Sequence, residues 1–315
     1  MNRHRHIRGS MFLAAALAAA LGAGVWAAAG APLQNPPPAE NPPTPEEVRR
    51  MTERILDNQR RNEASLAEFE RREHRREWRT AEHQRLEVDK IFRVVPTGTG
   101  TIKLVLEEKG QPVKPAFYVE QLRVLEEALD TAANRPDDPR QRRAIEKWEK
   151  RRAERKELVD AVSEAFEVRW LGREMRDGRN LAKVRMMPRP GFKPQTRIQE
   201  IFRHVEVTVW VDDDAGQMVR AEADIINDIS FGGGLFGKVS KGGRFVMEQS
   251  PAGNGLWLPS LYRFDYSGRK FIFPFSVHEE VRISDYRRIG PPAEALVAVR
   301  REIAEQARGL KSASD

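Results

Sequence analysis

A glycine-rich segment is the strongest hint of chemistry in the 315-residue sequence. Residues 232–238 read GGGLFGK, which nearly matches the loop that wraps nucleotide phosphates. In such a loop a Ser or Thr follows the lysine to hold Mg²⁺, and a helix N-terminus then receives the phosphates. Here Val239 follows Lys238, and residues 241–243 read KGG where the helix should begin. We therefore expect a bend or bulge between strands, without nucleotide binding.

Other residue types that support catalysis or metal binding are sparse. Without cysteine, the chain has no thiol nucleophile, thiolate zinc site or disulfide. His74, His83, His204 and His278 lie outside any close metal-binding spacing such as H-E-x-x-H. The acidic run 212–214 lacks the later acidic ligand of a calcium loop and predicts a hairpin turn. No G-x-S-x-G elbow occurs. The sequence therefore predicts no metal, no cofactor and no enzymatic activity.

The first 31 residues indicate export. Residues 1–10 contain three arginines and no acid, residues 11–29 are apolar, and residues 29–31 form a small-x-small cleavage pattern. This predicts a signal peptide cleaved before Pro32 and an exported, periplasmic protein. A retained single-span anchor is the alternative, because the apolar run is just long enough to cross a bilayer. Without cysteine, lipid attachment at the cleavage site is excluded.

The net charge of +7 invites a nucleic-acid interpretation, but the charge is concentrated. The expected signal peptide carries +3, residues 140–157 carry +5 from nine bases and four acids, and the remainder carries −1. A nucleic-acid footprint needs a broader basic surface, so we predict no nucleic-acid partner. The basic helix 140–157 is expected either to contact anionic headgroups or an acidic partner, or to be a solvated face with pairs such as Glu146 and Lys150.

The remaining chain predicts one domain over residues 44–290. Residues 32–43 hold six prolines in twelve residues and form an extended linker. The capping box of residues 44–47 starts a helix that is expected to end near Arg61. Further helices are expected in an inserted hairpin at about 115–165 and in a C-terminal helix and tail at 291–315. Turn residues separate β-rich runs, which predict strands at 68–79, 86–95, 102–106, 166–175, 181–187, 204–211, 218–226, 229–239, 244–249, 256–266 and 271–286. This is an antiparallel meander.

Alternation along the later strands predicts an apolar face on the sheet. The residues expected on that face, which are also the candidate ligand-binding surface, are Val207, Val209, Tyr262, Phe264, Tyr266, Phe271, Phe273 and Phe275. The predicted helices can cover this face as an ordinary core, or the face can retain an apolar cavity. Both outcomes need the same alternation, so the alternatives stay open.

Several C-terminal segments resemble a known family. They read VTVWVDDDAGQMVRAEADI, FGKVSKGGRFVMEQSP, GLWLPSLYRFDYSGRKFIF and EEVRISDYRRI. They resemble the periplasmic lipoprotein-carrier (LolA-like) superfamily, and more closely exported bacterial proteins described as outer-membrane lipoprotein-sorting-like. The similarity covers residues 204–289 well and 63–113 loosely. It implies an α+β fold in which a large curved antiparallel sheet, a half-barrel, wraps over helices around a cavity for acyl chains.

This resemblance implies a non-catalytic function. The leading hypothesis is a periplasmic lipid- or lipoprotein-acyl-chain-binding protein with carrier-like behaviour. The alternative is an envelope protein-interaction or structural protein whose core is closed by its own helices. The resemblance transfers no individual site residue, since its motifs are patterns of strands and turns.

Overall fold

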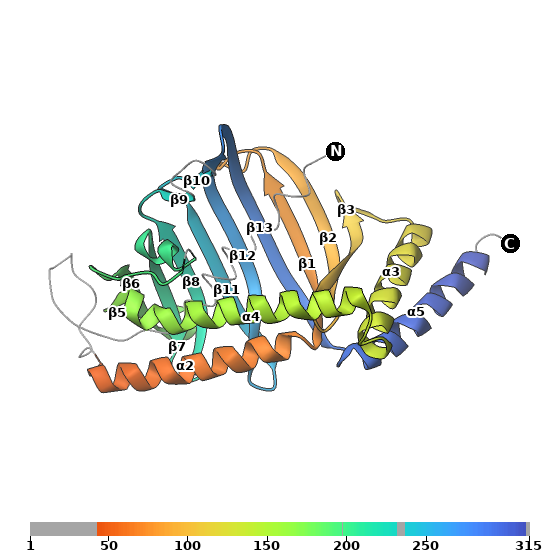
Figure 1. The fold of residues 1–315 in the computed structure, drawn as a ribbon, viewed down its shortest axis with the longest axis horizontal. Helices are drawn as coiled ribbons and strands as arrows, with labels where there is room; N and C mark the ends of the chain where they lie inside the picture. The colour runs from red at the N-terminus through yellow and green to blue at the C-terminus, as the bar shows by residue number, and fades with distance from the viewer. Residues whose placement is uncertain (1–42, 197, 232–236, 313–315) are drawn as a thin grey trace. The chain divides into compact units, whose positions relative to one another are not determined.

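The computed structural model describes residues 43–196, 198–231 and 237–312. The expected signal peptide, the linker up to Pro42 and most of the glycine-rich segment lie outside the described residues. Within them, 13 strands form one antiparallel sheet that does not close, and four α-helices accompany it (Figure 1). The predicted α+β class is confirmed.

The elements follow one another in nearly the predicted order. The helices are α2 (Pro45–Leu66), α3 (Pro115–Asn134), α4 (Pro139–Ala165) and α5 (Pro292–Ser312), with a short 3-10 helix, η2 (Gln199–Arg203). The strands are β1 (Phe69–Trp78), β2 (Leu86–Pro96), β3 (Thr101–Glu108), β4 (Gln111–Pro112), β5 (Phe166–Arg176), β6 (Arg179–Pro188), β7 (Val205–Asp212), β8 (Gln217–Ile225), β9 (Ile229–Phe231), β10 (Gly237–Val239), β11 (Arg244–Gly253), β12 (Leu256–Lys270) and β13 (Phe273–Arg288).

The sheet is a meander with one long-range junction. Its strand order is β4-β3-β2-β1-β13-β12-β11-β8-β7-β6-β5, and β10 pairs with β12 and β9. Neighbours in the chain are mostly neighbours in the sheet. Strand β11 pairs with β8, and β10 pairs with β12. The pairing most distant in the chain is that of β1, which lies antiparallel to the last strand so that Phe69 lies opposite Arg288. No local signal in the sequence announces this junction.

The described chain divides into two compact units. Unit 1 contains the chain up to Asn62 and residues 153–278, and unit 2 contains residues 63–152 and the chain from Glu279 onward. The domain boundary drawn at 44–290 stays a prediction.

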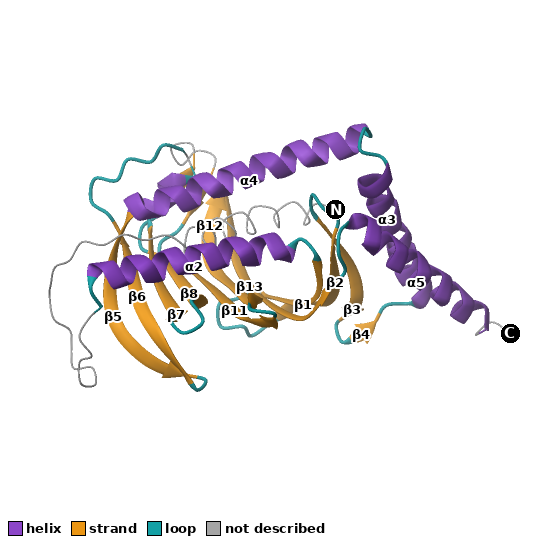
Figure 2. Ribbon diagram, turned by 90° about the horizontal axis from the view of Figure 1, so that it is seen from below, coloured by secondary structure: helices purple, strands orange, loops and turns teal. Residues whose placement is uncertain are grey.

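Unit 1 has its core on the helix-covered face of its strands. Every second residue of β7 is buried, from Val205 to Val211, as the alternation predicts. Opposite them, α4 contributes Leu158 and Val162, which are both fully buried, and α2 contributes Ile55. Figure 2 shows both helices over this face of the strands. The helix–sheet contact buries the apolar stripe of each element against the other.

Unit 2 has a separate core between its two complete helices and the strands β2 and β3. The core residues share aliphatic side chains at helical or alternating spacing. They are Val95, Leu104, Leu122, Leu125, Leu129, Ala295, Leu296 and Val299. The buried face of α3 contains Leu122, Leu125 and Leu129 at helical spacing.

Side chains cap the starts of two helices, and the first forms the predicted capping box. The amide of Thr44 donates to Glu47 Oε2 at 2.7 Å, and the amide of Glu47 donates to Thr44 Oγ1 at 3.3 Å, which completes the capping box. The hydrogen bond from the Thr44 backbone holds the pKa of Glu47 below its usual value. At α4, the amide of Arg140 donates to Asp138 Oδ1 at 2.7 Å. Helix α2 runs five residues beyond the predicted end at Arg61.

The strand predicted at 229–239 is wrong as a single element. The chain instead forms two short strands, β9 and β10, which pair antiparallel with Ile229 opposite Val239. The described ends of the glycine-rich segment thus belong to a hairpin.

Buried amides hold α2 onto unit 1. The side chain of Asn62, which is 2% exposed, donates to Gln217 Oε1 at 2.9 Å and accepts from the Trp257 amide at 3.2 Å. One turn earlier, Asn58 donates to the carbonyl of Gly216 at 2.7 Å. Two polar contacts, one to β8 and one to β12, therefore depend on the single Asn62 side chain.

We expect Asn62→Leu to lower the free energy of unfolding by about 2–4 kcal/mol, because it leaves the buried Gln217 amide and Trp257 N–H unpaired. Urea unfolding followed by circular dichroism measures the change. Asn58→Leu is the comparison variant. We expect a smaller loss there, since the closest contact of Asn58 is to a single carbonyl, that of Gly216. A loss at Asn62 no larger than that of an exposed substitution such as Asp57→Leu would contradict this role.

Candidate functional site: an aromatic row in unit 1

Five aromatic rings follow one another on the helix-covered face of β11, β12 and β13. We name Phe245, Tyr262, Phe264, Tyr266 and Phe275 the aromatic row. The Phe245 and Phe264 rings are 5.0 Å apart, Phe245 and Tyr262 are 6.2 Å apart, and Tyr262 and Phe264 are 6.4 Å apart. The Tyr266 and Phe275 rings meet edge to face at 6.1 Å. Centroid distances of this size are typical of favourable aromatic pairs.

Strand periodicity and one glycine place these rings together. Tyr262, Phe264 and Tyr266 alternate along β12, and Phe245 lies opposite Phe264 in the β11–β12 register. At Gly268 an added Cβ would lie 2.2 Å from the Lys238 carbonyl oxygen and 3.0 Å from the Phe275 ring. The absence of a side chain at position 268 therefore lets β10 and Phe275 approach β12 closely.

Coverage of the apolar face decreases from β7 toward β13. Val207 and Val209 are fully buried in the core beneath α4. Within the aromatic row, Phe245 and Phe264 are buried, whereas Tyr262, Tyr266 and Phe275 are only partly buried. Six of the eight predicted site residues thus share one apolar face. Of these six, only Tyr262, Tyr266 and Phe275 are partly exposed to solvent.

The prediction that Phe271 and Phe273 share this buried face is wrong. Strand β12 ends at Lys270, and Phe271 lies in the following turn with a φ of 53°. Phe273 starts β13 but is exposed. Both residues lie at the β12–β13 turn, outside the core cluster that contains Phe264. Alternation in the sequence does not show where that core ends.

Sequence reasoning missed Phe245 as a member of the row. The alternation of Phe245 and Met247 on β11 was available as a signal, but it is only two residues long. Its significance depends on the pairing of β11 with β12, which brings the ring against Phe264.

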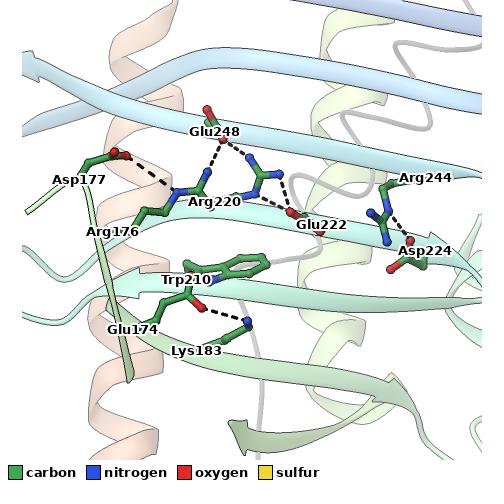
Figure 3. A network of polar contacts seen from close by, with 10 residues as sticks. All are labelled: Glu174, Arg176, Asp177, Lys183, Trp210, Arg220, Glu222, Asp224, Arg244 and Glu248. Atoms are coloured by element: carbon green, nitrogen blue, oxygen red, sulfur yellow. Dashed lines mark hydrogen bonds and ion pairs between the residues drawn. The ribbon is translucent and has the colours of Figure 1, made fainter. Parts of the chain in front are cut away.

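The opposite face of unit 1 carries charged side chains that are paired with one another (Figure 3). Arg220 forms ion pairs with Glu222, at 2.5 Å, and with Glu248. Arg176 also reaches Glu248 at 3.3 Å, and Arg244 binds Asp224 at 2.6 Å. The pairs Arg220–Glu248 and Arg244–Asp224 join the neighbouring strands β8 and β11, and opposite charges within the network neutralise one another.

Trp210 lies buried within this charged network. Its indole Nε1 donates to Glu174 at 2.7 Å, and Lys183 Nζ lies 4.8 Å from the indole ring centroid while also binding Glu174 at 3.0 Å. Burial raises the pKa of Glu174, but the hydrogen bonds from Lys183 and Trp210 outweigh burial and hold that pKa below its usual value. A carboxylate held ionised in this way stabilises the sheet surface and is poorly suited to accept a proton.

Unit 2 contains a second charged cluster, which is more deeply buried. Arg93 donates to Glu70 at 2.8 Å, to Glu302 at 2.7 Å and to the Tyr118 hydroxyl at 3.0 Å. Burial lowers the pKa of Arg93, but these partners raise it overall. Burial raises the pKa of Tyr118. The cluster ties β1, β2, α3 and α5 together through complementary charges.

The four histidines lie apart, each with its own partner. His74 contacts Asp89 at 2.6 Å, His278 contacts Asp265 at 3.2 Å, His204 contacts Glu200 at 3.5 Å, and the His83 ring stacks on Trp78 at 4.2 Å. Among the residues that the structure describes, no group of three or more His, Asp or Glu side chains has a metal-binding arrangement.

The acidic run 212–214 forms a turn between β7 and β8 that contacts α2. Asp212 Oδ1 accepts from the Ala215 amide at 2.9 Å. Arg54 donates to the carbonyls of Asp213, at 3.1 Å, and Asp214, at 2.7 Å. The predicted hairpin turn is confirmed.

The basic run 140–157 lies on α4, and most of its lysine and arginine side chains are exposed. Arg151 donates to the Thr99 carbonyl at 2.9 Å, Arg152 lies 5.4 Å from the Trp148 ring, and Lys156 pairs with Asp160 at 2.6 Å. A partner for this run stays a prediction. In residues 43–196, 198–231 and 237–312, we find no helix with the length and apolarity that a membrane span requires.

The protein belongs to the α+β class, with an open antiparallel sheet and helices on its apolar face. Three solved structures are similar to it at low scores. They are a putative outer membrane lipoprotein-sorting protein domain from Vibrio parahaemolyticus (9% identity, 77% of this chain and 90% of that chain, TM-score 0.30), a LolA superfamily protein from Nitrosomonas europaea (11%, 73% and 92%, 0.28) and a DUF1329 family protein from Desulfovibrio piger (11%, 77% and 90%, 0.26).

Two of these descriptions name the family that the sequence resembles. No family model matches the chain, and no curated protein matches it.

Proposed function

We propose that the protein binds the acyl chain of a lipid or lipoprotein against the aromatic row, without catalysis. One observation carries the proposal: Tyr262, Tyr266 and Phe275 are only partly covered on a face that is otherwise buried. Partly covered rings at the edge of a core offer apolar area to a ligand at about 25 cal/mol per Å² buried. The tyrosine hydroxyls suit the boundary between an acyl chain and its polar head.

Burial of the apolar face decreases from β7 toward β13. We therefore place the ligand at the aromatic row and not over the whole face of the sheet. Val207 and Val209 are already buried in the core cluster that includes residues of α4, so the ligand would bind beside them, over β12 and β13. The export that residues 1–31 predict would place this activity in the periplasm.

The same gradient supports the alternative of a closed core. Around β7 and β8 the inward side chains are buried in one cluster with residues of α2 and α4, as expected where the protein's own helices close the core. The two candidates differ only at the aromatic row, which is where an experiment separates them.

We expect the full chain, purified without detergent, to carry bound lipid in native mass spectrometry, and Tyr262→Ser/Phe275→Ser to lose most of it. The double substitution removes two partly exposed rings while keeping the core residues Phe245 and Phe264. Phe117→Ser is the matched control, because it removes a half-exposed ring from α3.

Two outcomes would contradict acyl-chain binding. The wild-type chain could give a homogeneous lipid-free mass, which would favour the closed core. Alternatively, the double variant could retain as much lipid as Phe117→Ser, which would place the lipid elsewhere.

A further inference from the structure

The turn between β12 and β13 presents three consecutive apolar side chains to solvent. Phe271, Ile272 and Phe273 are 49%, 81% and 69% exposed, and we name these three residues the hairpin tip. Strands β12 and β13 have 15 and 16 residues, and their turn lies at the upper edge of the sheet in Figure 1. Contiguous exposed apolar side chains of this kind mark interaction sites in soluble proteins.

Local folding does not account for the residues at the tip. Phe271 has a φ of 53°, a conformation that favours glycine, asparagine or aspartate in a hairpin turn. The base of the hairpin, in contrast, is fixed, since Phe275 packs against Tyr266 and Gly268. The structure thus packs Phe275 at the base of the hairpin and leaves Phe271 and Phe273 exposed to solvent. An outlier that the fold does not need is grounds for a functional hypothesis.

The charges around the tip are basic. Arg269 and Lys270 directly precede it and are exposed, and residues 267–276 contain no acid. On the neighbouring strand, Lys238 lies opposite Arg269 and pairs with Asp228 at 2.6 Å. The negative charge of Asp228 is therefore already neutralised by Lys238. Two copies meeting tip to tip would bring these cations together, which disfavours self-association.

We propose that the hairpin tip binds the surface of an anionic lipid bilayer. Ile272 and Phe273 insert at the boundary between headgroups and acyl chains, where aromatic rings are favoured. Arg269 and Lys270 pair with lipid phosphates, which basic residues beside an apolar anchor reinforce. This inference does not rest on the acyl-chain site, because it uses neither the aromatic row nor the helix-covered face.

The lack of cysteine in the sequence makes a local test possible. Ile272→Cys in the full chain is labelled with an environment-sensitive fluorophore and mixed with vesicles of phosphatidylcholine and phosphatidylglycerol in equal parts, or of phosphatidylcholine alone. We expect a blue shift and brightening with the anionic vesicles and a weaker response with the neutral ones. Residues 11–29 are apolar and can bind vesicles themselves. A fluorophore at position 272 is therefore used, because it reports the environment of the tip and not the binding of the whole chain.

Two labelled controls test the mechanism. Met175→Cys places the label at another exposed apolar residue, 70% exposed, next to Asp177 in the β5–β6 hairpin, and we expect no blue shift there. Adding Phe273→Ser, Arg269→Gln and Lys270→Gln to Ile272→Cys should weaken the vesicle response about tenfold or more.

Three results would overturn the proposal. The label at position 272 could ignore anionic vesicles, or the neutralised variant could respond as fully as its parent. The label could also shift with protein concentration alone, which would make the tip a contact between copies. Circular dichroism of each variant verifies that the fold is intact.

Discussion

We expect Phe166→Ala to lower the free energy of unfolding by about 3–5 kcal/mol. Phe166 is 1% exposed, and its ring meets the buried Phe202 ring edge to face at 5.3 Å. It begins β5 directly after α4, so its ring packs at the point where helix and sheet join in unit 1. Truncation removes the burial of the ring and leaves a void that close-packed neighbours fill only in part.

Urea unfolding measures this change, and Phe117→Ala is the matched control. Phe117 is 46% exposed, so the same truncation there should cost about 1 kcal/mol or less. Equal losses at both positions would contradict the helix–sheet core of unit 1.

The second large effect is expected at Glu73 in unit 2. Its buried carboxylate pairs with Arg71 at 2.8 Å and with Lys103. Burial raises the pKa of Glu73, but the charges of Lys103 and Arg71 outweigh burial and hold that pKa below its ordinary value. We expect Glu73→Gln to cost about 2–3 kcal/mol at neutral pH, because it leaves these cations without their counter-charge.

The sign of the pH dependence follows from the lowered pKa. Glu73 stabilises the folded state above its unfolded pKa, near 4.5, and this contribution disappears as the pH falls through the lower folded pKa. The difference in unfolding free energy between wild type and Glu73→Gln should therefore shrink in acid. A difference that stays constant down to acid pH would show that the charge is not responsible.

Glu279 provides a matched control of opposite sign in the same unit. Burial raises its pKa although Arg75 lies 3.0 Å away. Its ionised form therefore costs stability as the pH rises through the folded pKa. We expect Glu279→Gln to be neutral or stabilising at neutral pH, in contrast to Glu73→Gln.

Strand β1 shows which features of the structure can be predicted from neighbouring residues in the sequence and which cannot. The stretch from Glu68 to Arg79 is so rich in charge that helix propensity would also have been acceptable, and the strand prediction is confirmed. Nothing local, however, shows that Glu73 is buried. Its burial arises because β1 lies between β2 and β13, and Glu73 pairs with Ile283, about two hundred residues further along the chain.

The candidate site shows the same division. Alternation predicted correctly that Tyr262, Phe264, Tyr266 and Phe275 share a face. It also assigned Phe271 and Phe273 to that face, because a period of two contains no information about where the covering helices end.

The sequence by itself determined the α+β class, nearly all the helices and strands, the capping box at Thr44 and the turn at 212–214. These follow from side-chain period, capping and turn chemistry, which act within a few residues. Only the tertiary structure decided that β1 joins β13, that Val207 is sealed beneath α4 while Tyr262 is half-covered, and that Phe271 to Phe273 remain in solvent. Burial is a property of the space around a residue, and distant segments fill that space.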